Sequence, residues 1–389
     1  MIKLWLYNVE NVCYTVIINN YIRSKRLDIE IYSFFSGLGL LDLGFEKAGF
    51  DIVFVNEYNR NFLQAYQYAR RDSKHTPAYG YSSKNVRDYI DDEVWEKRFP
   101  TYNNREKKLI GFIGGPPCPD FSIAGKNKGK NGNNGQLSSV YVNLIVKRQP
   151  DFFVFENVKG LYRTQKHREF YEKLKRKLYR QGYSLFDSIE NALEYGVPQN
   201  RDRLILIGFR RKTFGARIKF KFGKNKKYNL DDICRISWPT TSLFKENLNI
   251  KVPNNIIEDL TVEYWFKKNN VENHVNGKDF FSVKKKDKFF EIQEGDLKGK
   301  SFKRLHRWRF SPTAAYGNNE VHLHPYLPRR ISVAEALAIQ SVPKEFELKK
   351  EITLSDKFKM VGNGVPYLLS LGIAKDIYDW IKNNRGDTK

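Results

Sequence analysis

A cysteine in a rigid loop is the first candidate for chemistry in this sequence. Cys118 lies in the run from Gly114 to Ser122, which places two glycines and three prolines around it. Such a loop has little conformational freedom, and this preorganises a covalent nucleophile. A cysteine buried for packing would more usually lie within an apolar run, and no histidine is adjacent to form a protease-type pair. Cys13 and Cys234 lack such a setting and are predicted to be structural.

Polar groups at the borders of two apolar runs would extend this site. Glu156 and Asn157 end the apolar run that begins at Phe152. Partial burial would raise the pKa of Glu156 and let its carboxyl group donate a proton. Arg201 and Arg203 precede another apolar run, and a guanidinium group suits planar recognition of oxygen acceptors. Taken singly, each of these groups also fits a surface ion pair.

A glycine-containing turn indicates a nucleoside site. The sequence Ser36, Gly37, Leu38, Gly39 follows an apolar run that ends at Phe35, and glycine lets the backbone approach a ligand closely at a helix N-terminus. Glu57 stands twenty residues after Gly37, where an acid would hold ribose hydroxyls. The third glycine of a dinucleotide fingerprint is missing. The pattern therefore favours a single nucleoside such as S-adenosylmethionine over a nicotinamide or flavin cofactor, with a tight structural turn as the alternative.

These groups need a scaffold of alternating strands and helices. Continuous apolar runs between amphipathic stretches predict an α/β fold, a doubly wound and mostly parallel sheet with its chemistry at the carboxyl ends of the strands. The expected strands are Ile29 to Phe35, Ile52 to Asn56, Leu109 to Gly114, Phe152 to Glu156 and Leu204 to Phe209. The expected helices are Gly39 to Ala48, Phe62 to Ala69, Val140 to Arg148, His167 to Gln181, Val333 to Gln340 and Pro366 to Ile381.

The charge of the chain points to a polyanionic partner. Its 389 residues include 68 Lys plus Arg and 44 Asp plus Glu, a net charge of +24, within an ordinary globular composition of 41% hydrophobic residues. A surplus of this size favours phosphate neutralisation on a nucleic acid. Residues 211 to 310 hold 24 Lys plus Arg against 12 Asp plus Glu, which is half of that surplus. This predicts a separate basic domain, although a solvated lysine-rich face has the same composition.

Cysteine usage and hydropathy bear on the compartment. Three cysteines without a Cys-x-x-Cys pair suggest neither a disulfide framework nor a zinc site, so we expect no metal and a reducing compartment. No run approaches the ~18 apolar residues of a membrane span. Asn19 and Asn20 interrupt the apolar stretch near the start, and no cleavage site follows, so no signal peptide is expected. These features predict a cytoplasmic protein with no membrane partner.

Six motifs in a fixed order resemble the DNA (cytosine-5) methyltransferase family. They are Phe-Ser-Gly-x-Gly from Phe35, Pro-Pro-Cys from Pro116, Glu-Asn-Val from Glu156, Gln-x-Arg-x-Arg from Gln199, the segment Arg330 to Pro343, and Gly-Asn-Gly-Val from Gly362. The resemblance implies a Rossmann-like methyltransferase fold with a smaller, basic target-recognition domain. It divides the chain into an N-terminal extension (1-27), a discontinuous catalytic domain (28-210 plus 329-389) and the target-recognition domain (211-328).

The resemblance also assigns catalytic roles. Cys118 would attack C6 of a target cytosine as a thiolate, so that C5 accepts a methyl group from S-adenosylmethionine. Glu156 would contact N3 and the exocyclic amine, and Arg203 would contact O2, where charge develops in the transition state. Because C6 lies inside a stacked duplex, the base must be flipped out. Two neighbours complete the expected catalytic set: Arg201 and Asn157.

For the cofactor, the resemblance implies one pocket built from several segments. Glu57 would hold the ribose and Tyr58 would stack on the adenine. The family usually recognises the adenine amine with an Asp before an aliphatic residue. Here Asn85 before Val86 is the match, and its carbonyl oxygen keeps the acceptor. The other expected contacts are Phe35, Ser36, Gly37, Leu38, Gly39, Pro116, Asn363 and Val365.

The implied partner is double-stranded DNA. Ser122 and the loop that follows Cys118 would close over the flipped nucleotide. Arginines of the basic region would contact base edges or phosphates. The candidates are Arg304, Arg307 and Arg309. The chain departs from usual family residues at Leu40, Pro119, Ala338 and Met360, none of which touches the three main catalytic positions.

The sequence thus predicts a sequence-specific methyltransferase of a bacterial restriction-modification system or of a solitary type. We expect a monomer in the cytoplasm, associated with the nucleoid, with a cognate restriction endonuclease as a further partner. One alternative is a catalytically silent DNA-binding relative, against which the intact Cys118, Glu156 and Arg203 argue. Another is an RNA cytosine methyltransferase of the same fold, whose Cys-Phe-Thr signature does not occur here. The target sequence is not predicted.

Overall fold

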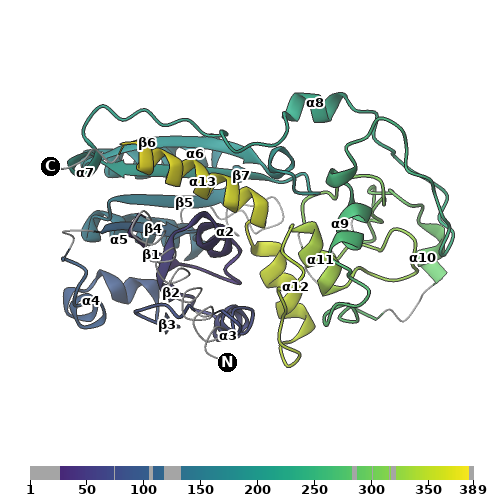
Figure 1. Ribbon diagram of the computed structural model, residues 1–389, viewed down its shortest axis with the longest axis horizontal. Helices are drawn as coiled ribbons and strands as arrows, with labels where there is room; N and C mark the ends of the chain where they lie inside the picture. Colours follow the sequence, from purple (N-terminus) through teal and green to yellow (C-terminus); the bar gives the residue numbers. More distant parts are fainter. Residues whose placement is uncertain are drawn as a thin grey trace, which may run out of the picture.

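A seven-stranded sheet forms the larger of two lobes in the computed structural model (Figure 1). The structure describes residues 27–73, 75–104, 108–117, 133–282, 287–299, 301–314, 316 and 321–384, without the side chains of 133–135. Cys13, Cys118 and Ser122 therefore lie outside the described residues. The strands are β1 (Ile29–Phe34), β2 (Asp51–Asn56), β3 (Tyr81–Ser82), β4 (Leu109–Gly114), β5 (Phe152–Val158), β6 (Tyr183–Asn191) and β7 (Asp202–Arg210).

The strand order is β3-β2-β1-β4-β5-β7-β6. The sheet is parallel from β3 through β5, and β7 runs antiparallel to both of its neighbours. Because β1 connects outward to β2 on one side and β4 connects outward to β5 on the other, the loops after β1 and β4 diverge at the carboxyl edge and leave a crevice there. The predicted mostly parallel, doubly wound α/β sheet is confirmed.

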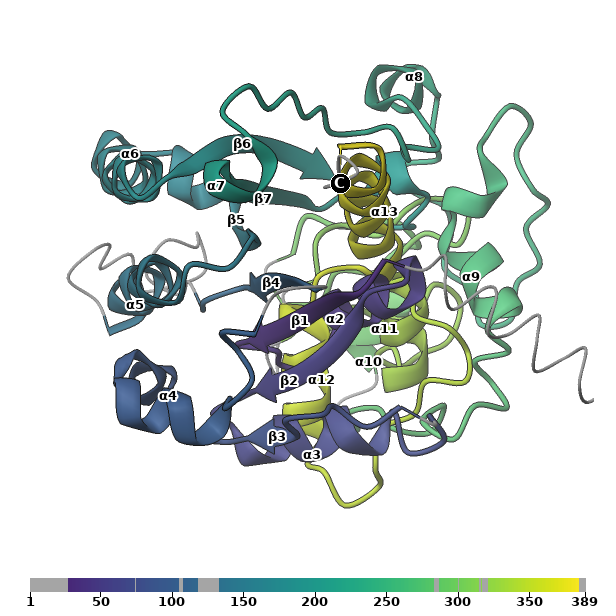
Figure 2. The same cartoon turned by 60° about the vertical axis from the view of Figure 1, so that its left-hand side comes forward.

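Helices cover both faces of the sheet. Figure 2 shows α4, α5 and α6 on one side and α2 and α13 on the other. The helices of the larger lobe are α2 (Leu40–Ala48), α3 (Arg60–Tyr68), α4 (Asp92–Arg98), α5 (Asn133–Arg148), α6 (Gln165–Arg180), α7 (Arg211–Phe214) and α13 (Tyr367–Asn384). Those outside it are α8 (Leu230–Arg235), α9 (Val262–Lys268), α10 (Asp287–Glu291), α11 (Val333–Ile339) and α12 (Leu354–Asn363). Within the described residues, no helix is long and apolar enough to cross a bilayer.

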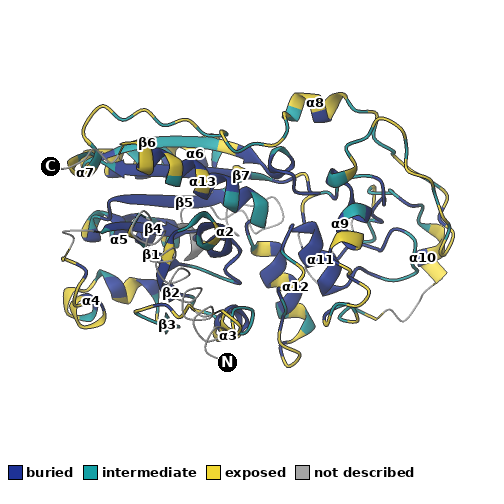
Figure 3. Cartoon of the chain, in the orientation of Figure 1, coloured by how far each residue is buried: buried dark blue, intermediate teal, exposed yellow. Residues whose placement is uncertain are grey.

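Side chains of each strand alternate between two apolar cores. On β1, Ile31 belongs to the core beneath α2 and α13, and Tyr32 belongs to the opposite core beneath α4, α5 and α6. This alternation is the period of two expected for a strand buried on both faces. The second core is rich in aromatic rings, with Tyr32 at 5.1 Å from Phe99 and 6.1 Å from Trp95 between ring centroids. Figure 3 shows β5 as buried and the edge strand β6 as mostly intermediate, so the central strands are the ones held rigidly.

The expected strands and helices are largely confirmed. All five expected strands are present, with ends that differ by no more than two residues. The sequence did not predict the edge strand β6, because most of its side chains are only half-buried and it carries no continuous apolar run. Helix α5 begins at Asn133 rather than Val140, because the polar residues of its first turns lack apolar periodicity.

At both expected boundaries of the second domain, packing links the two parts of the chain. Phe214, Phe220 and Phe222 pack into the core between the sheet and α13, and backbone N–H groups of Gly223 and Asn225 donate to a carboxylate of α13. The chain after residue 210 therefore stays on the sheet lobe for about 15 more residues. At the other end α11, expected in the catalytic domain, packs against α9 within the second lobe. After residue 210, the lysine-rich composition begins before the chain leaves the core of the sheet lobe.

The two lobes share one of their apolar cores. This core joins buried residues of α9 and α11 to Leu38, Leu40 and Phe62 of the sheet lobe. Helix α12 contacts α11 on one side and α3 on the other. The second lobe is thus seated directly against the start of α2, beside the crevice at the carboxyl edge.

Candidate active site

The turn after β1 has an unusual backbone. Phe35, Gly37 and Gly39 all have positive φ, at 55°, 55° and 76°, a region that L side chains rarely adopt. The turn is closed by a hydrogen bond from Gly39 N to Ser36 O at 2.7 Å. A Cβ added to Gly37 would have no described atom within 4 Å. The turn therefore presents its backbone to open space, which fits close approach of a ligand.

Glu57 lies at the end of β2 and reaches this turn. Its carboxylate accepts from Gly37 N and from Asn59 N, each at 2.8 Å. Burial raises the pKa of Glu57, and the two backbone donors oppose that rise. Each oxygen keeps a further lone pair for a ligand hydroxyl. Tyr58 is 71% exposed, so its ring is not buried in a core and is available to a ligand beside the turn.

Asn85 is brought to the same edge by a residue that sequence reasoning missed. The Asn56 amide donates to the carbonyls of Ser82 and Lys84 at 3.2 and 2.9 Å, which holds the segment before Asn85 beside the end of β2. The only sign of this role in the sequence was the amide side chain of Asn56 at the end of an apolar run. Asn85 Oδ1 accepts from Arg87 N at 3.1 Å, so an adenine amine would have to use its second lone pair.

Glu156 and Arg203 form a buried ion pair between β5 and β7. Arg203 Nε lies 2.8 Å from Glu156 Oε1, with both side chains about a tenth exposed. A Cβ on Gly115 would lie 2.6 Å from Glu156 Oε2, so the loop after β4 passes directly over the carboxylate. Burial raises the pKa of Glu156, and the arginines Arg203 and Arg201 oppose that rise.

Asn157 connects the same strand to the loop that leads toward Cys118. Its Nδ2 donates to Pro116 O at 3.3 Å, and its Oδ1 accepts from Val158 N at 2.8 Å. The side chain is buried. Asn157 therefore fixes the path of the loop, which makes it a positioning residue. The structure brings Glu156, Asn157, Arg203 and Pro116 together at one edge, as the sequence predicted.

Arg201 donates its hydrogen bonds to the fold, although its charge acts on Glu156. Its guanidinium is buried and donates to the carbonyls of Ala314, Gly362 and Gly364 at 3.0, 2.7 and 3.2 Å. The carbonyls of Gly362 and Gly364 flank Asn363, and that of Gly364 precedes Val365. These contacts give Arg201 a structural role, and its catalytic role stays a prediction. Arg201 ties β7 to the junction of α12 and α13.

That junction reaches the turn after β1. A Cβ on Gly364 would lie 2.6 Å from a methyl carbon of Leu40, so this glycine permits close contact with the first residue of α2. Asn363 is exposed at this point and Val365 is buried. The fold thus places residues more than 300 positions apart in sequence side by side, as expected for Asn363 and Val365 at a shared pocket.

Two of the three arginines expected to contact DNA are internal. Arg304 is fully buried and donates to the carbonyls of Phe289, Ile292, His324 and Leu327. Arg307 is buried in a two-point ion pair with Glu294, with both contacts at 2.8 Å. Their predicted DNA contacts are wrong, because neither guanidinium reaches the surface. Arg309 is half-buried, with one contact to a carbonyl at 3.3 Å, and stays a candidate.

Comparison with known proteins identifies the family. A family model described as C-5 cytosine-specific DNA methylase matches residues 29–379. The chain belongs to this family. The methyltransferase is 54% identical over 373 residues to Type II methyltransferase M.NmeDI of Neisseria meningitidis serogroup C, covering 95% of this chain and 88% of that protein. It is 31% identical over 360 residues to Type II methyltransferase M.MthTI of Methanothermobacter thermautotrophicus, covering 90% and 97%.

Solved structures support the methyltransferase fold. A putative DNA modification methyltransferase encoded within an E. coli prophage is 23% identical, with a TM-score of 0.56 over 91% of this chain and 99% of that one. The S. pombe Dnmt2 methyltransferase is 13% identical, with a TM-score of 0.57 over 91% and 98%. The prediction of a DNA cytosine-5 methyltransferase is confirmed. The family description names DNA, which favours this prediction over the RNA-directed alternative.

Proposed function

We propose that the enzyme transfers a methyl group from S-adenosylmethionine to C5 of a flipped-out cytosine through a covalent bond from Cys118 to C6. The observation that carries this proposal is the buried pair of Glu156 and Arg203. It lies beneath the loop that leads to Cys118, and Asn157 holds that loop in place. A proton donor and a cation side by side are what N3 and O2 of a pyrimidine require.

Cys118, Glu156 and Arg203 would each have a separate role in the reaction. Cys118 gives an electron pair to C6 as a thiolate, and Glu156 gives a proton to N3, so that the charge of the attack is neutralised. Arg203 donates to O2 and holds the base in its plane. After methylation, a water molecule takes the proton from C5, its electron pair restores the C5–C6 double bond, and the Cys118 thiolate departs from C6. The Glu156 carboxylate then regains its proton from N3.

The residues after β1 and β2 fit the cofactor. Open space faces Gly37, the Glu57 carboxylate lies beside it, and Tyr58 presents a free ring. When bound, S-adenosylmethionine supplies an electrophilic methyl group on a sulfonium. Glu57 would hold the ribose hydroxyls, and Tyr58 would stack on the adenine. The other contacts proposed are Phe35, Ser36, Leu38, Gly39, Asn85, Val86, Pro116, Asn363 and Val365.

We further propose that the second lobe recognises the target within a restriction-modification system. The Type II names of the relatives support this role, with a cognate endonuclease as partner. The enzyme would act as a monomer on cytoplasmic, nucleoid DNA, with Arg309 and Ser122 among its contacts. No metal has a place in the proposed reaction. In the described part of the chain, no group of three metal-ligating side chains is present.

Bisulfite sequencing of a plasmid tests this function. Expression of the enzyme should protect one cytosine in every copy of a short sequence from conversion. Cys118→Ser should abolish that protection and leave DNA binding within a few-fold of the wild type, because a hydroxyl is a far weaker nucleophile than a thiolate. Full protection by the Cys118→Ser variant would remove Cys118 from the mechanism. The absence of any protected site with the wild type would contradict the function itself.

A further inference from the structure

We propose that Arg70 is a positioning residue that clamps the turn after β1 in its cofactor-binding conformation. This inference rests on the proposed binding of S-adenosylmethionine at that turn. Arg70 follows α3 in sequence, and nothing in the six motifs of the family pattern includes it. The geometry that follows shows how one guanidinium holds the outer side of the turn while its inner side faces the ligand.

The Arg70 guanidinium divides its donors between the turn and α2. Nη2 donates to Gly39 O at 2.7 Å, and Nη1 donates to Leu38 O at 3.4 Å. Nε donates to Glu46 Oε1 at 2.9 Å, which orients the planar group. The Arg70 side chain is only 9% exposed. A rigid fork with a carboxylate behind it and two carbonyls in front is well suited to fix a backbone.

Tyr66 completes the clamp by packing against both Arg70 and the turn. Its ring lies 3.9 Å from the guanidinium carbon of Arg70, in the arrangement of a cation–π contact. A Cβ on Gly39 would lie 2.2 Å from the same ring, so the turn rests directly on Tyr66. Glycine at position 39 is therefore required twice, by its positive φ and by this close approach.

A buried hydrogen-bond chain carries the clamp to the inner side of the turn. Tyr66 donates to Asp42 Oδ2 at 3.0 Å, and Ser33 donates to Asp42 Oδ1 at 2.9 Å. The Ser33 hydroxyl also lies 2.8 Å from the Ser36 hydroxyl. These contacts link Arg70 to Ser36, while the space beside Gly37, where the ligand would lie, stays open.

The turn needs such an external clamp because its own backbone is strained. Three of its five residues have positive φ, and one of them, Phe35, is not glycine. Gly39 is the N-cap of α2 and has no side chain to cap the helix. Because the Gly39 carbonyl and the Leu40 N–H belong to one planar peptide, they point in opposite directions. Gly39 O also accepts from Leu43 N at 2.9 Å, so Arg70 and α2 together fix the direction of the Leu40 N–H.

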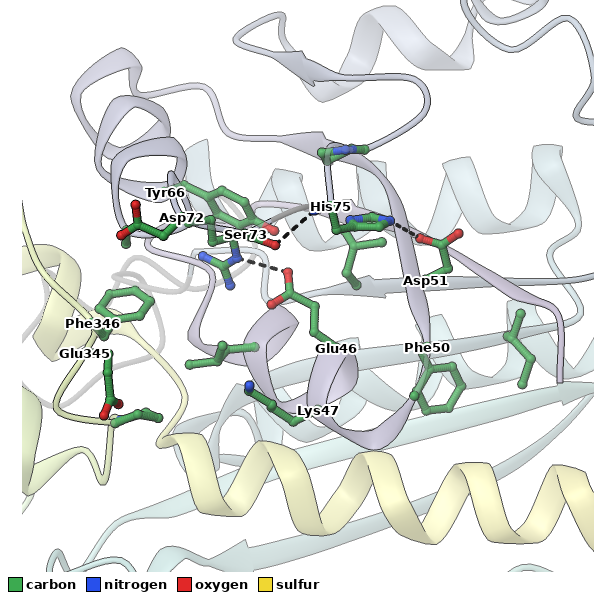
Figure 4. Close-up of a pocket in the computed structure, with 18 of the residues that line it drawn as sticks. Glu46, Lys47, Phe50, Asp51, Tyr66, Asp72, Ser73, His75, Glu345 and Phe346 are labelled. Carbon is green, nitrogen blue, oxygen red and sulfur yellow. Dashed lines mark hydrogen bonds and ion pairs between the residues drawn. The ribbon is translucent and has the colours of Figure 1, made fainter. Parts of the chain in front are cut away.

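Arg70 can be reached from the solvent on its far side. A groove of about 1000 Å³ opens at the amino ends of β1 and β2, opposite the carboxyl edge, and Arg70 lies among its lining residues. Figure 4 shows Glu46 and Tyr66 in this groove. A small guanidinium compound would therefore be able to enter the space left by truncation of the Arg70 side chain.

The test compares Arg70 with its neighbour in sequence. Arg70→Met should raise the Kd for S-adenosylmethionine, by calorimetry, and its KM, in turnover assays, by about tenfold, since two hydrogen bonds to the turn are lost. The kcat at saturating cofactor and the Kd for DNA should stay within about threefold. Arg71→Met is the matched control, because Arg71 pairs with Glu347 at the surface. It should leave both cofactor constants unchanged.

Two further measurements separate positioning from folding. Arg70→Ala truncates the side chain at Cβ, so millimolar methylguanidinium should lower its raised KM and should not affect the wild type or Arg71→Met. Arg70→Lys keeps a cation beside Glu46 but loses the planar fork, so it should fold and still show a raised KM.

If Arg70→Met binds S-adenosylmethionine with wild-type affinity, the clamp is overturned. If Arg70→Met does not fold, the same result in Arg70→Lys overturns it. If the wild-type enzyme itself does not bind S-adenosylmethionine, the proposed function fails, and the clamp fails with it. Normal binding by the wild type together with unchanged variants would overturn the clamp alone. The two failures are therefore distinguishable.

Discussion

The two lobes are held together by different physical means. In the sheet lobe, β1, β4 and β5 bury apolar side chains on both faces, and their backbone groups pair within the sheet. In the second lobe the chain is mostly irregular between short helices. There, among the residues that the structure describes, no sheet pairs the backbone carbonyls, and the buried Arg304 donates hydrogen bonds to several of them. Buried Arg307 donates to Glu294.

This difference changes the meaning of the positive charge. Buried carbonyl groups need partners, and an arginine with five N–H donors provides several at once. Part of the basic surplus of residues 211 to 310 therefore stabilises the lobe internally and never meets DNA. Net charge alone cannot distinguish these two uses. Burial distinguishes them, and it leaves the half-buried Arg309 as the candidate for DNA contact among the three arginines.

Replacing Arg304 should have the largest effect on this comparison. Arg304→Met would remove the Arg304 donors of four carbonyls, of which Leu327 O keeps a second donor in Arg329 N. It should lower the free energy of unfolding by about 5 kcal/mol, measured by urea denaturation. Arg309→Met is the matched control and should lower it by less than about 1 kcal/mol. Equal stability of the two variants would show that Arg304 is not an internal support of the second lobe.

Glu156 should show the opposite pattern, with an effect on chemistry rather than on lobe assembly. Glu156→Gln preserves the shape of the side chain but cannot give a proton to N3, so kcat should fall about a thousandfold. The Kd for cognate duplex should change by only a few-fold, because the Glu156 carboxylate lies in the catalytic crevice. Single-turnover methylation and fluorescence anisotropy measure the two quantities. A kcat within tenfold of the wild type would exclude Glu156 as the proton donor.

Asp42 tests the polar network within the apolar sheet lobe, and its effect should be the smallest. Burial raises the pKa of Asp42 from 3.8 to about 6, with Glu46 adding to the rise and Arg70, Ser33 and Tyr66 opposing it. Because the pKa is higher in the folded state, the folded state binds more protons between these values, and stability falls as the pH rises through this window.

Asp42→Asn removes this pH dependence. Its unfolding free energy relative to the wild type should rise by about 3 kcal/mol or less from the lower to the upper end of the window, and stay constant above it. Urea denaturation of both proteins across the window measures the difference. A pH-independent difference would show that Asp42 titrates normally in the folded enzyme.

The sheet and its catalytic edge were predictable because their signals are local. Apolar runs mark β1, β4 and β5, and the polar residue that ends a parallel strand must lie at the shared carboxyl edge. Glu156 and Glu57 follow this rule, and both lie where the sequence placed them. Edge strand β6 escaped prediction because half-buried side chains leave no such pattern.

The roles of individual arginines were not predictable, because they depend on distant carbonyls. Arg201 and Arg203 are two residues apart and were both assigned to catalysis, yet Arg201 bonds to backbone more than 100 positions away. Arg70 forms its contacts across more than 30 residues and lies in no motif. Backbone acceptors carry no side-chain signal, so a sequence cannot show which guanidinium they will bind.

The central claim is the covalent route from Cys118 to C6, and 5-fluorocytosine at the target position tests it most directly. Because C5 carries fluorine in place of hydrogen, no proton can be removed from it. The reaction should therefore stop after methyl transfer and before elimination. We predict a denaturation-resistant adduct of enzyme and duplex in equimolar ratio, formed only with S-adenosylmethionine present and absent with Cys118→Ser. A wild-type enzyme that methylates normal cognate duplex but forms no adduct with the fluorinated one would contradict the account.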